Sequence, residues 1–263
     1  MSRRRAACAV VPLILISGCG GTTHPSRGSA GDAVERVAYT VVARHPHDTA
    51  AFTEGLVVHD GAFLEGTGLV GRSELRRVEI ASGRVRARRR LPPAVFGEGV
   101  TVHGDHVFQL TWKNHTGFLW RTAGLRASGT WRYAGEGWGL TTMGDDLVMS
   151  DGTSILRVLD PATRAVRRRV TVTEDGAPVE RLNELEYVGD GRVAANVWPT
   201  TTIVVVDMAT GHVTATLDIS ALAAEQPPTA NEANGIALDP RSGHWYVTGK
   251  NWATMYEIAP EPG

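Results

Sequence analysis

The stretch VVDMATGHV at residues 205–213 places a β-branched run before a polar turn and the start of a second strand after it. Three other stretches share this plan: residues 78–85 (VEIASGRV), 158–166 (VLDPATRAV) and, in a shorter unit, 238–245 (LDPRSGHW). Each predicts a hairpin whose turn needs a residue that tolerates a positive φ angle, and the three longer copies supply Gly83, Arg164 and Gly211. A hairpin that recurs every few tens of residues is typical of propeller blades or of a solenoid.

From Ala38 onward, short β-type runs alternate with turn residues. Such runs are residues 56–58, 107–110, 147–149 and 203–206. Only residues 221–225 predict a helical turn, which Pro227 and Pro228 would end. At roughly 40–50 residues per blade there is room for about five blades, so we expect an all-β chain, a five-bladed β-propeller over residues 38–263. Spacing alone does not separate five blades from six, and a β-sandwich is the alternative that the repeated hairpin argues against.

The N-terminal segment has the pattern of an export signal. Arginines at residues 3–5 precede an apolar run at residues 6–16, which is shorter than the roughly 20 apolar residues that span a bilayer. The run ends in LISGC at residues 15–19, which resembles a bacterial lipobox. Signals of that kind are cut before the cysteine, which is then acylated. We therefore expect a lipoprotein signal peptide over residues 1–18 and an exported cell-envelope lipoprotein anchored in the membrane at Cys19, with its domain outside the cytoplasm. An ordinary cleaved signal with a chance cysteine is the alternative.

Residues 20–32 are rich in glycine, serine and threonine, so residues 19–37 are expected to be the lipidated cysteine and a flexible tether. Cys8 lies in the removed segment, which leaves the mature domain without a disulfide or a thiolate site. The formal net charge of −1 gives no reason to expect nucleic acid as a partner. The arginine-rich residues 84–90 predict a solvated strand face, with contact to an acidic surface as the alternative.

Two features point to a site. Of the seven tryptophans, Trp112, Trp138, Trp198 and Trp252 lie beside small or polar residues, which favours a lined pocket over packing between blades. The segment FGEG at residues 96–99 places a carboxylate between two glycines. In an aromatic pocket, desolvation would raise the pKa of that carboxyl and suit it to proton transfer, whereas taken alone the segment reads as a polar turn.

Strand alternation predicts which side chains share a face in two further segments. In a strand, Asn183 and Leu185 would face one way and Glu184 and Glu186 the other. By the same rule Phe52 and Glu54 share a face.

A series of segments, in order over residues 39–258, resembles the plant and bacterial glutaminyl cyclases, or glutaminyl-peptide cyclotransferases. The segments are residues 52–56 (FTEGL), 68–76 (GLVGRSELR), 96–99 (FGEG), 109–112 (QLTW), 137–140 (GWGL), 150–152 (SDG), 183–187 (NELEY), 196–198 (NVW), 234–237 (NGIA) and 248–250 (TGK). The resemblance implies a five-bladed propeller. It also implies cyclisation of the N-terminal glutamine of peptides or proteins to pyroglutamate, with loss of ammonia.

The resemblance also implies roles for single residues. Glu98 matches the proton-shuttling glutamate of the family. The substrate-binding positions that match are Phe52, Glu54, Phe96, Trp112, Trp138, Asn183, Glu184, Trp198 and Lys250. Asn183 would hold a substrate carbonyl, and Lys250 a carbonyl or the tetrahedral oxyanion. The chain departs from the plant members at Glu54, where they tend to have glutamine. This second carboxylate would either hold the substrate ammonium or raise the pKa of Glu98 by repulsion.

The nine histidines show no zinc-type spacing, so we expect catalysis without a metal or other cofactor. Some family members hold a calcium ion in the central channel, and a structural calcium is the one ion that the resemblance allows here. The expected oligomeric state is a monomer. Three other functions remain open at this point: a non-catalytic propeller that binds peptides or envelope proteins, an envelope scaffold, and a hydrolase or lyase for sugars that uses Glu54 with Glu98.

Overall fold

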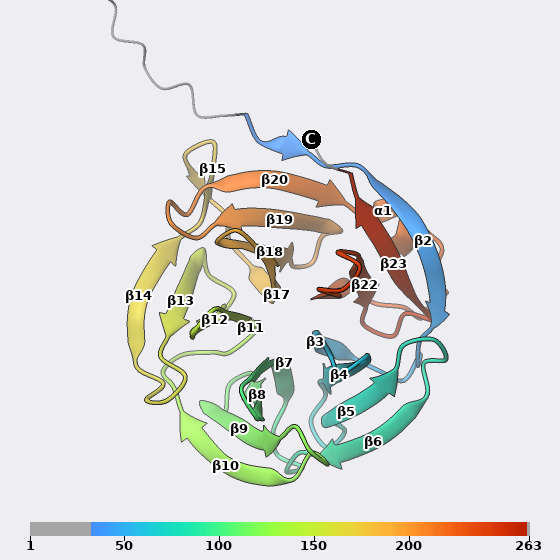
Figure 1. Ribbon diagram of the computed structural model, residues 1–263, viewed down its shortest axis with the longest axis vertical. Helices are drawn as coiled ribbons and strands as arrows, with labels where there is room; N and C mark the ends of the chain where they lie inside the picture. The colour runs from blue at the N-terminus through green and yellow to red at the C-terminus, as the bar shows by residue number, and fades with distance from the viewer. Residues whose placement is uncertain (1–32, 262–263) are drawn as a thin grey trace, which may run out of the picture. The chain divides into compact units, whose positions relative to one another are not determined.

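The computed structural model describes residues 33–261. The predicted signal peptide at residues 1–18 and the predicted lipidation site Cys19 lie outside the described residues. Within them the chain forms five blades of four antiparallel strands, arranged around a centre (Figure 1), and one of these sheets gains a fifth, parallel strand at its outer edge. The predicted five-bladed β-propeller is confirmed.

The blades follow one another along the chain. Blade 1 consists of β3 (Thr53–His59), β4 (Ala62–Thr67), β5 (Glu74–Glu79) and β6 (Val85–Arg90). Blade 2 consists of β7 (Gly97–His103), β8 (His106–Thr111), β9 (Thr116–Arg121) and β10 (Ala127–Arg132). Blade 3 consists of β11 (Leu140–Met143), β12 (Asp146–Met149), β13 (Ile155–Leu159) and β14 (Val166–Thr171).

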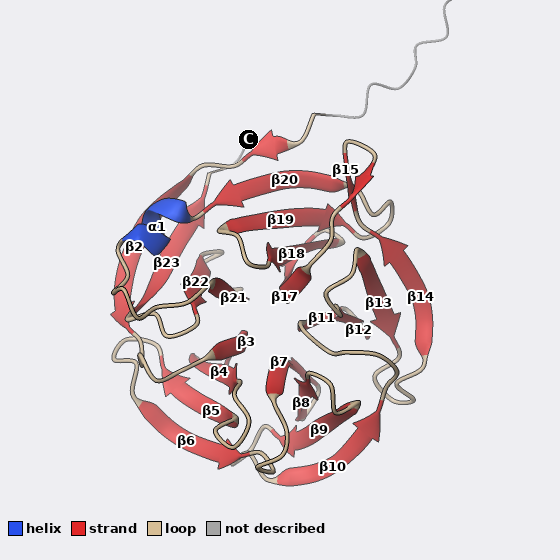
Figure 2. Ribbon diagram, turned by 180° about the vertical axis from the view of Figure 1, so that it is seen from behind, coloured by secondary structure: helices blue, strands red, loops and turns tan. Residues whose placement is uncertain are grey.

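Blade 4 consists of β17 (Leu182–Gly189), β18 (Arg192–Val197), β19 (Thr202–Asp207) and β20 (Val213–Asp218). Blade 5 takes its three inner strands from the C-terminal part and its outer strand from the N-terminal part: β21 (Ala233–Leu238), β22 (Trp245–Gly249), β23 (Thr254–Pro260) and β2 (Tyr39–Pro46). The remaining elements are the strand β1 (Glu35–Arg36), the small hairpin of β15 (Thr173–Glu174) and β16 (Ala177–Pro178), and the helix α1 (Ser220–Ala224). Figure 2 shows the innermost strands β3, β7, β11, β17 and β21 around the centre.

The hairpins that decided the fold lie where their sequence predicts. The turns between β5 and β6, β13 and β14, and β19 and β20 hold Gly83, Arg164 and Gly211 at φ angles of 67°, 63° and 81°. They join the two outer strands of three blades. The related turn in residues 238–245 instead joins β21 and β22, the inner strands of blade 5. The four predicted strand runs fall in β3, β8, β12 and β19, and the predicted helical turn is α1.

Aliphatic side chains fill the space between neighbouring blades. Leu64 and Leu75 of blade 1, for example, pack with Val100 and Val107 of blade 2, and all four are buried. Full burial of one such side chain stabilises the fold by about 1.5–3 kcal/mol. The outermost strands carry polar residues. The arginine-rich strand β6 exposes Arg86 and Arg88–Arg90, as predicted for a solvated face.

The first and last parts of the described chain close the ring. Strand β2 pairs antiparallel with β23, from Tyr39 opposite Pro260 to Pro46 opposite Thr254. Strand β1 adds to the outer edge of blade 4 by parallel pairing with β20. The folded part therefore begins before residue 38, where the sequence predicted its start. Within residues 33–261, no helix combines the length and the apolar character needed to cross a membrane.

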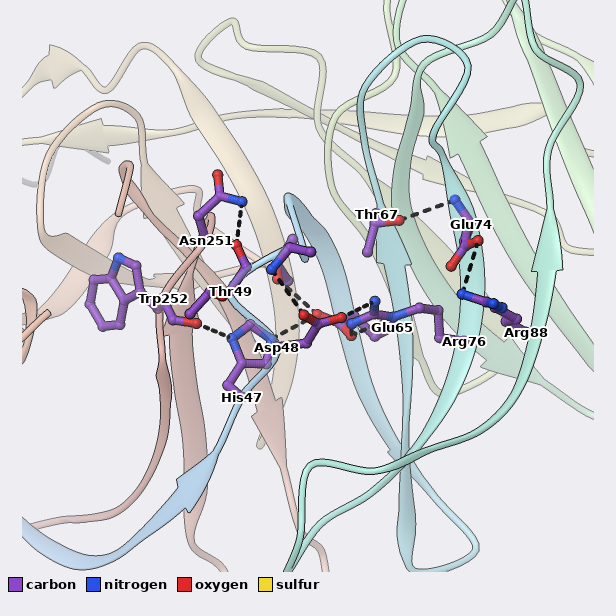
Figure 3. Close-up of polar contacts among 12 residues, drawn as sticks. His47, Asp48, Thr49, Glu65, Thr67, Glu74, Arg76, Arg88, Asn251 and Trp252 are labelled. Carbon is purple, nitrogen blue, oxygen red and sulfur yellow. Dashed lines mark hydrogen bonds and ion pairs between the residues drawn. The ribbon is translucent and has the colours of Figure 1, made fainter. Parts of the chain in front are cut away.

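A buried ionic network lies beside this closure, between blades 5 and 1 (Figure 3). The Nδ1 of His47 faces the carbonyl oxygen of Trp252 at 2.9 Å, and its Nε2 faces Glu65 Oε1 at 2.9 Å. Both ring nitrogens face acceptors, so the ring is best satisfied as a cation. On the other side of Glu65, Arg76 donates to Glu65 Oε2 at 2.8 Å and to Asp48 Oδ2 at 2.9 Å.

Charge pairing outweighs burial in this network. Burial would lower the pKa of His47, but the adjacent Glu65 carboxylate raises it above its ordinary value. Burial would raise the pKa of Glu65, but Arg76 and His47 hold that pKa well below its usual range. Glu65, on β4, is thus a buried carboxylate held between two cations. These are Arg76 on β5 and His47 directly after β2.

Candidate active site

A cavity of about 350 Å³ opens on one face of the propeller. Its lining residues are Phe52, Glu54, Phe96, Glu98, Trp112, Trp138, Asn183, Trp198, Glu232 and Lys250. All but one of the residues predicted to form the site are among them. The structure therefore brings together side chains that span some 200 residues of sequence, from Phe52 to Lys250.

The repeat explains why these residues meet. Each innermost strand begins on this face, and the residues at or just before its start point into the cavity: Phe52 and Glu54 (β3), Phe96 and Glu98 (β7), Trp138 (β11), Asn183 (β17) and Glu232 (β21). Each second strand ends on the same face. The residues that follow those ends are Trp112 after β8, Trp198 after β18 and Lys250 after β22.

The two glycines beside Glu98 hold its strand against its neighbours. The Gly97 N–H donates to Ser73 Oγ at 2.8 Å, and the Gly99 N–H donates to the Trp138 carbonyl oxygen at 2.8 Å. A Cβ atom on Gly99 would lie only 2.6 Å from that oxygen, so a side chain there would push blade 3 away. The backbone therefore fixes Glu98 from both sides, in blade 1 and in blade 3.

Glu98 is 5% exposed and lines the cavity. Burial raises its pKa well above the ordinary value, and repulsion from Glu54 and Glu136 adds to this, while Lys250 opposes it. Among residues 33–261, no group donates a hydrogen bond to this carboxyl that would lower its pKa. Glu98 is thus a buried carboxyl whose oxygens remain available to a ligand.

The second carboxyl, Glu54, is engaged on both oxygens. Lys250 Nζ lies 3.0 Å from Glu54 Oε1, and Asn234 Nδ2 donates to Glu54 Oε2 at 3.1 Å. Burial raises the pKa of Glu54 to about 7 despite the opposing charge of Lys250, and Glu232 contributes further repulsion. Lys250 Nζ also lies 4.8 Å from the centre of the Phe52 ring, a cation–π contact that fixes the ammonium group at the cavity wall.

The aromatic walls pack edge to face. Phe96 contacts Phe52 and Trp112 with ring centres 6.1 and 5.7 Å apart, and Trp138 contacts Trp198 at 6.1 Å. Trp252, which the sequence grouped with the pocket tryptophans, is not among the lining residues. It is 1% exposed, donates from Nε1 to the Asn231 carbonyl oxygen at 3.0 Å and packs on Tyr256. For this tryptophan the packing interpretation is correct.

Glu136 holds two walls of the pocket together. Its Oε2 accepts hydrogen bonds from Trp112 Nε1 at 2.6 Å and from Trp138 Nε1 at 2.9 Å. Slight burial would raise the pKa of Glu136, but these two donors and Lys113 lower it below the ordinary value, so the clamp stays ionised. The sequence prediction did not include Glu136 or the lining residue Glu232. Glu136 adjoins Trp138 in sequence, but nothing there indicates that Trp112 of blade 2 reaches the same oxygen.

Glu184 points away from the cavity, as the alternation with Asn183 predicts. It is buried and accepts the Leu56 N–H at 3.3 Å on Oε1 and the Ile236 N–H at 2.8 Å on Oε2. Burial and the nearby Glu186 raise the pKa of Glu184 well above its ordinary value. The carboxyl therefore joins three innermost strands rather than meeting a ligand in the cavity.

The described residues contain no group of three or more histidine, cysteine or acidic side chains that would hold a metal ion. The central carboxyls Glu184 and Glu186 both accept backbone N–H groups, and such donors repel a cation. Both carboxyls are thus already hydrogen-bonded to the backbone. The possible structural calcium that the family resemblance allows stays a prediction.

Comparisons with known proteins agree on one family. The family model described as glutamine cyclotransferase matches residues 13–259. The chain belongs to the glutamine cyclotransferase family. It is 35% identical over 272 residues to a glutaminyl-peptide cyclotransferase of Arabidopsis thaliana, covering 98% of this chain and 84% of that protein. It also matches the crystal structure of Myxococcus xanthus glutaminyl cyclase with a TM-score of 0.80 and 36% identity, covering 87% of this chain and 98% of that one. With the family shown, the non-catalytic alternatives are not favoured.

The clamp at Glu136 can be tested by two substitutions. Glu136→Ala removes the acceptor shared by Trp112 and Trp138, so both rings lose their orientation, and we expect the KM for a glutamine-starting peptide to rise about tenfold. Glu136→Gln keeps an acceptor oxygen, so it should recover most of the wild-type KM and of the near-ultraviolet circular dichroism. Equal effects of the two substitutions on KM and on the spectrum would contradict a positioning role for this side chain.

Proposed function

We propose that this chain cyclises the N-terminal glutamine of peptides or proteins to pyroglutamate and releases ammonia. Family membership supports this function, and so does an aromatic cavity, open on one face of the propeller, whose wall contains a buried carboxyl without an ion-pair partner among residues 33–261. The cavity volume of about 350 Å³ suits a single residue with part of the chain that follows it.

The reaction is intramolecular. The α-amine of the substrate attacks the γ-carboxamide carbon, a C–N bond forms, and after collapse of the tetrahedral adduct the old C–N bond breaks and ammonia leaves. The attacking nitrogen must lose a proton and the leaving nitrogen must gain one. Aromatic walls that hold the glutamine side chain folded back on its own amine place the reacting atoms together. A correctly oriented intramolecular pair is worth up to about 7–11 kcal/mol of the barrier.

The contrast between Glu98 and Glu54 supports Glu98 as the carboxyl that transfers the proton. Glu54 is engaged by Lys250 and Asn234, whereas the Glu98 carboxyl meets no hydrogen-bond donor among the described residues. Glu98 is therefore free to take the proton from the attacking amine and to return it to the leaving nitrogen. Its raised pKa brings its affinity for a proton closer to that of the groups with which it exchanges.

Two other side chains are placed to hold the amide. Asn183 is 3% exposed, and its Oδ1 has no hydrogen-bond partner within residues 33–261. A buried acceptor without a partner is costly, and an N–H of the substrate would satisfy it. With its amide turned by 180°, the same residue would donate to a carbonyl of the substrate, the role that the family resemblance implies. Lys250 supplies the positive charge in the cavity wall that would stabilise the oxyanion.

Glu98→Gln keeps the shape of the side chain and removes its capacity to accept a proton. We expect kcat for a glutamine-starting peptide, measured by ammonia release, to fall about 100- to 10,000-fold while thermal unfolding is unchanged. Glu79→Gln serves as the matched control and should keep wild-type activity. Glu79 ends strand β5 of blade 1, pairs with Arg86 and does not line the cavity. Near wild-type turnover by Glu98→Gln would end the assignment of this residue as the proton shuttle.

Glu54→Gln tests how the second carboxyl affects the first, and it installs the residue that plant members tend to have. A raised pKa means that Glu98 loses its carboxylate form, and the enzyme its activity, when pH falls through that pKa. Removing the Glu54 charge lessens the repulsion and frees Lys250 to act on Glu98, so the pKa of Glu98 should fall. The acid limb of the kcat–pH profile should therefore move to lower pH. An unmoved limb would show that a different group controls it.

We further propose that the chain is exported and anchored in the cell envelope through acylated Cys19. The arginines at residues 3–5, the apolar residues 6–16 and the LISGC segment support this proposal. In a bacterial host that processes lipoproteins, the protein should partition into the detergent phase and the membrane fraction, and Cys19→Ser should move it to the aqueous phase. Wild-type protein that is already in the aqueous phase would rule out the anchor.

A further inference from the structure

A second cavity, of about 270 Å³, lies in blade 1 next to the aromatic pocket, and its wall is basic. We call it the basic cavity; its charged lining residues are Asp48, Arg72, Glu74, Arg76, Arg88 and Arg90. Two of the arginines belong to the arginine-rich strand β6, for which the proposed reaction has no use. Arg76 and Glu74 lie on the neighbouring strand β5, and Figure 3 shows the Glu74 carboxyl turned toward Arg88.

The loop between β4 and β5, residues 68–73, borders both cavities. Gly68 lies against the aromatic pocket, because a Cβ there would be 2.4 Å from the Phe96 ring and 3.0 Å from Glu54 Cγ. Three and four residues later, Gly71 and Arg72 line the basic cavity. A peptide that leaves the aromatic pocket over this loop therefore reaches the basic cavity within a few residues, since extended chain spans about 3.3 Å per residue.

The loop between β4 and β5 is held in one shape. The Arg72 N–H donates to the Leu69 carbonyl oxygen at 2.9 Å in a tight turn with Gly71 at a φ angle of 78°. Ser73 Oγ donates to the same Leu69 oxygen at 2.9 Å and accepts the Gly97 N–H at 2.8 Å, which ties the loop to the strand that carries Glu98. The position of Arg72 relative to the aromatic pocket is thus built into the fold.

The charges in the basic cavity do not balance. Arg76 already forms ion pairs with Glu65 and Asp48 in the buried network. Glu74 alone faces Arg88 and Arg90, at 3.8 and 3.4 Å, and Arg72 has no ion-pair partner among residues 33–261. Arg88 and Arg90 therefore share one carboxylate, and the exposed Arg72 adds a third guanidinium group without a carboxylate of its own among these residues. The aromatic pocket has the opposite composition, with the carboxyl groups of Glu54, Glu98 and Glu232 beside a single cationic side chain, Lys250.

We propose that Arg72, Arg88 and Arg90 bind a carboxylate of the substrate beyond its N-terminal glutamine, so that the enzyme prefers glutamine-starting peptides with a nearby acidic group. This inference rests on the proposed function and adds the substrate class. The planar guanidinium group pairs with carboxylates through two parallel hydrogen bonds, and three such groups on a fixed wall offer that pairing without a change of fold. The carboxylate is either an acidic side chain or the C-terminus of a short substrate.

A peptide series tests the preference. Tetrapeptide amides that start with glutamine carry glutamate, alanine or lysine at the second, third or fourth position, and a free-acid version of the alanine peptide represents the C-terminal carboxylate. Glutamate at a favoured position should raise kcat/KM by roughly three- to tenfold over alanine at low salt, mainly through KM, and lysine should lower it. High salt should remove the difference, because these guanidinium groups are exposed.

Two variants assign the effect to the cavity. The double variant Arg72→Gln with Arg88→Gln should have the same kcat/KM for acidic and neutral peptides. Arg89→Gln is the matched control, because Arg89 lies between the two cavity arginines on β6, alternates to the other face and donates to the Gly124 carbonyl oxygen at 2.8 Å. The Arg89→Gln variant should keep the wild-type preference in kcat/KM for acidic peptides. No preference at any position, or a preference that survives in the double variant, would overturn the proposal.

Binding separates this proposal from the proposed function. The Kd of the same peptides for the Glu98→Gln protein, followed by the fluorescence of the pocket tryptophans, should show the same acidic preference without turnover. Failure of the wild-type protein to release ammonia from any peptide would count against the proposed reaction, whereas equal Kd values for acidic and neutral peptides would count against the basic cavity.

Discussion

The ring closes through a strand from the N-terminal part of the chain, and the rest of the structure depends on that closure. Strand β2 completes blade 5 by pairing with β23, and the residue that follows it, His47, enters a buried ionic network with Glu65 and Arg76 of blade 1. A buried ion pair adds little net stability compared with apolar packing, but loss of one partner leaves an uncompensated charge. The network thus favours one register of blade 5 against blade 1, and the five inner strands converge only when this register is set.

Convergence of the inner strands creates the site. Each blade has its first strand begin and its second strand end on the same face, so equivalent positions of the repeat surround one cavity. Close backbone approach, as at Gly99, lets the inner strands of neighbouring blades lie close enough for their side chains to meet. Glu98 is buried because its neighbours on both sides are other blades, and its high proton affinity follows from that position in the ring.

The sequence predicts the propeller well because its information is local. A hairpin turn with Gly83, Arg164 or Gly211 is decided within a few residues, and the structure has positive φ angles at all three. Strand alternation likewise separates Asn183 in the cavity from Glu184 behind it. The lining of the pocket was predicted through family resemblance, since each motif alone is short.

The residues that the sequence prediction missed act across blades. Glu136 matters because Trp112 and Trp138 both donate to it, and Trp252 is core because Asn231 and Tyr256 surround it. Such relations depend on the angle between blades, which no short stretch of sequence determines. The same reason explains why β1, two residues long, was predicted to belong to the tether: it is a strand only because β20 offers its edge.

The shared fifth blade has a consequence for the order in which the protein forms during synthesis. The partner of β2 is β23, whose residues leave the ribosome last among the strands, so β2 must wait unpaired while four blades are made. Contacts so distant in sequence form slowly, because a long loop has to close before they are gained. Until then the nascent chain is an open arc with an exposed edge at each end. A chain with this topology becomes a closed ring in one late step, and a site that needs all five inner strands is acquired in that same step.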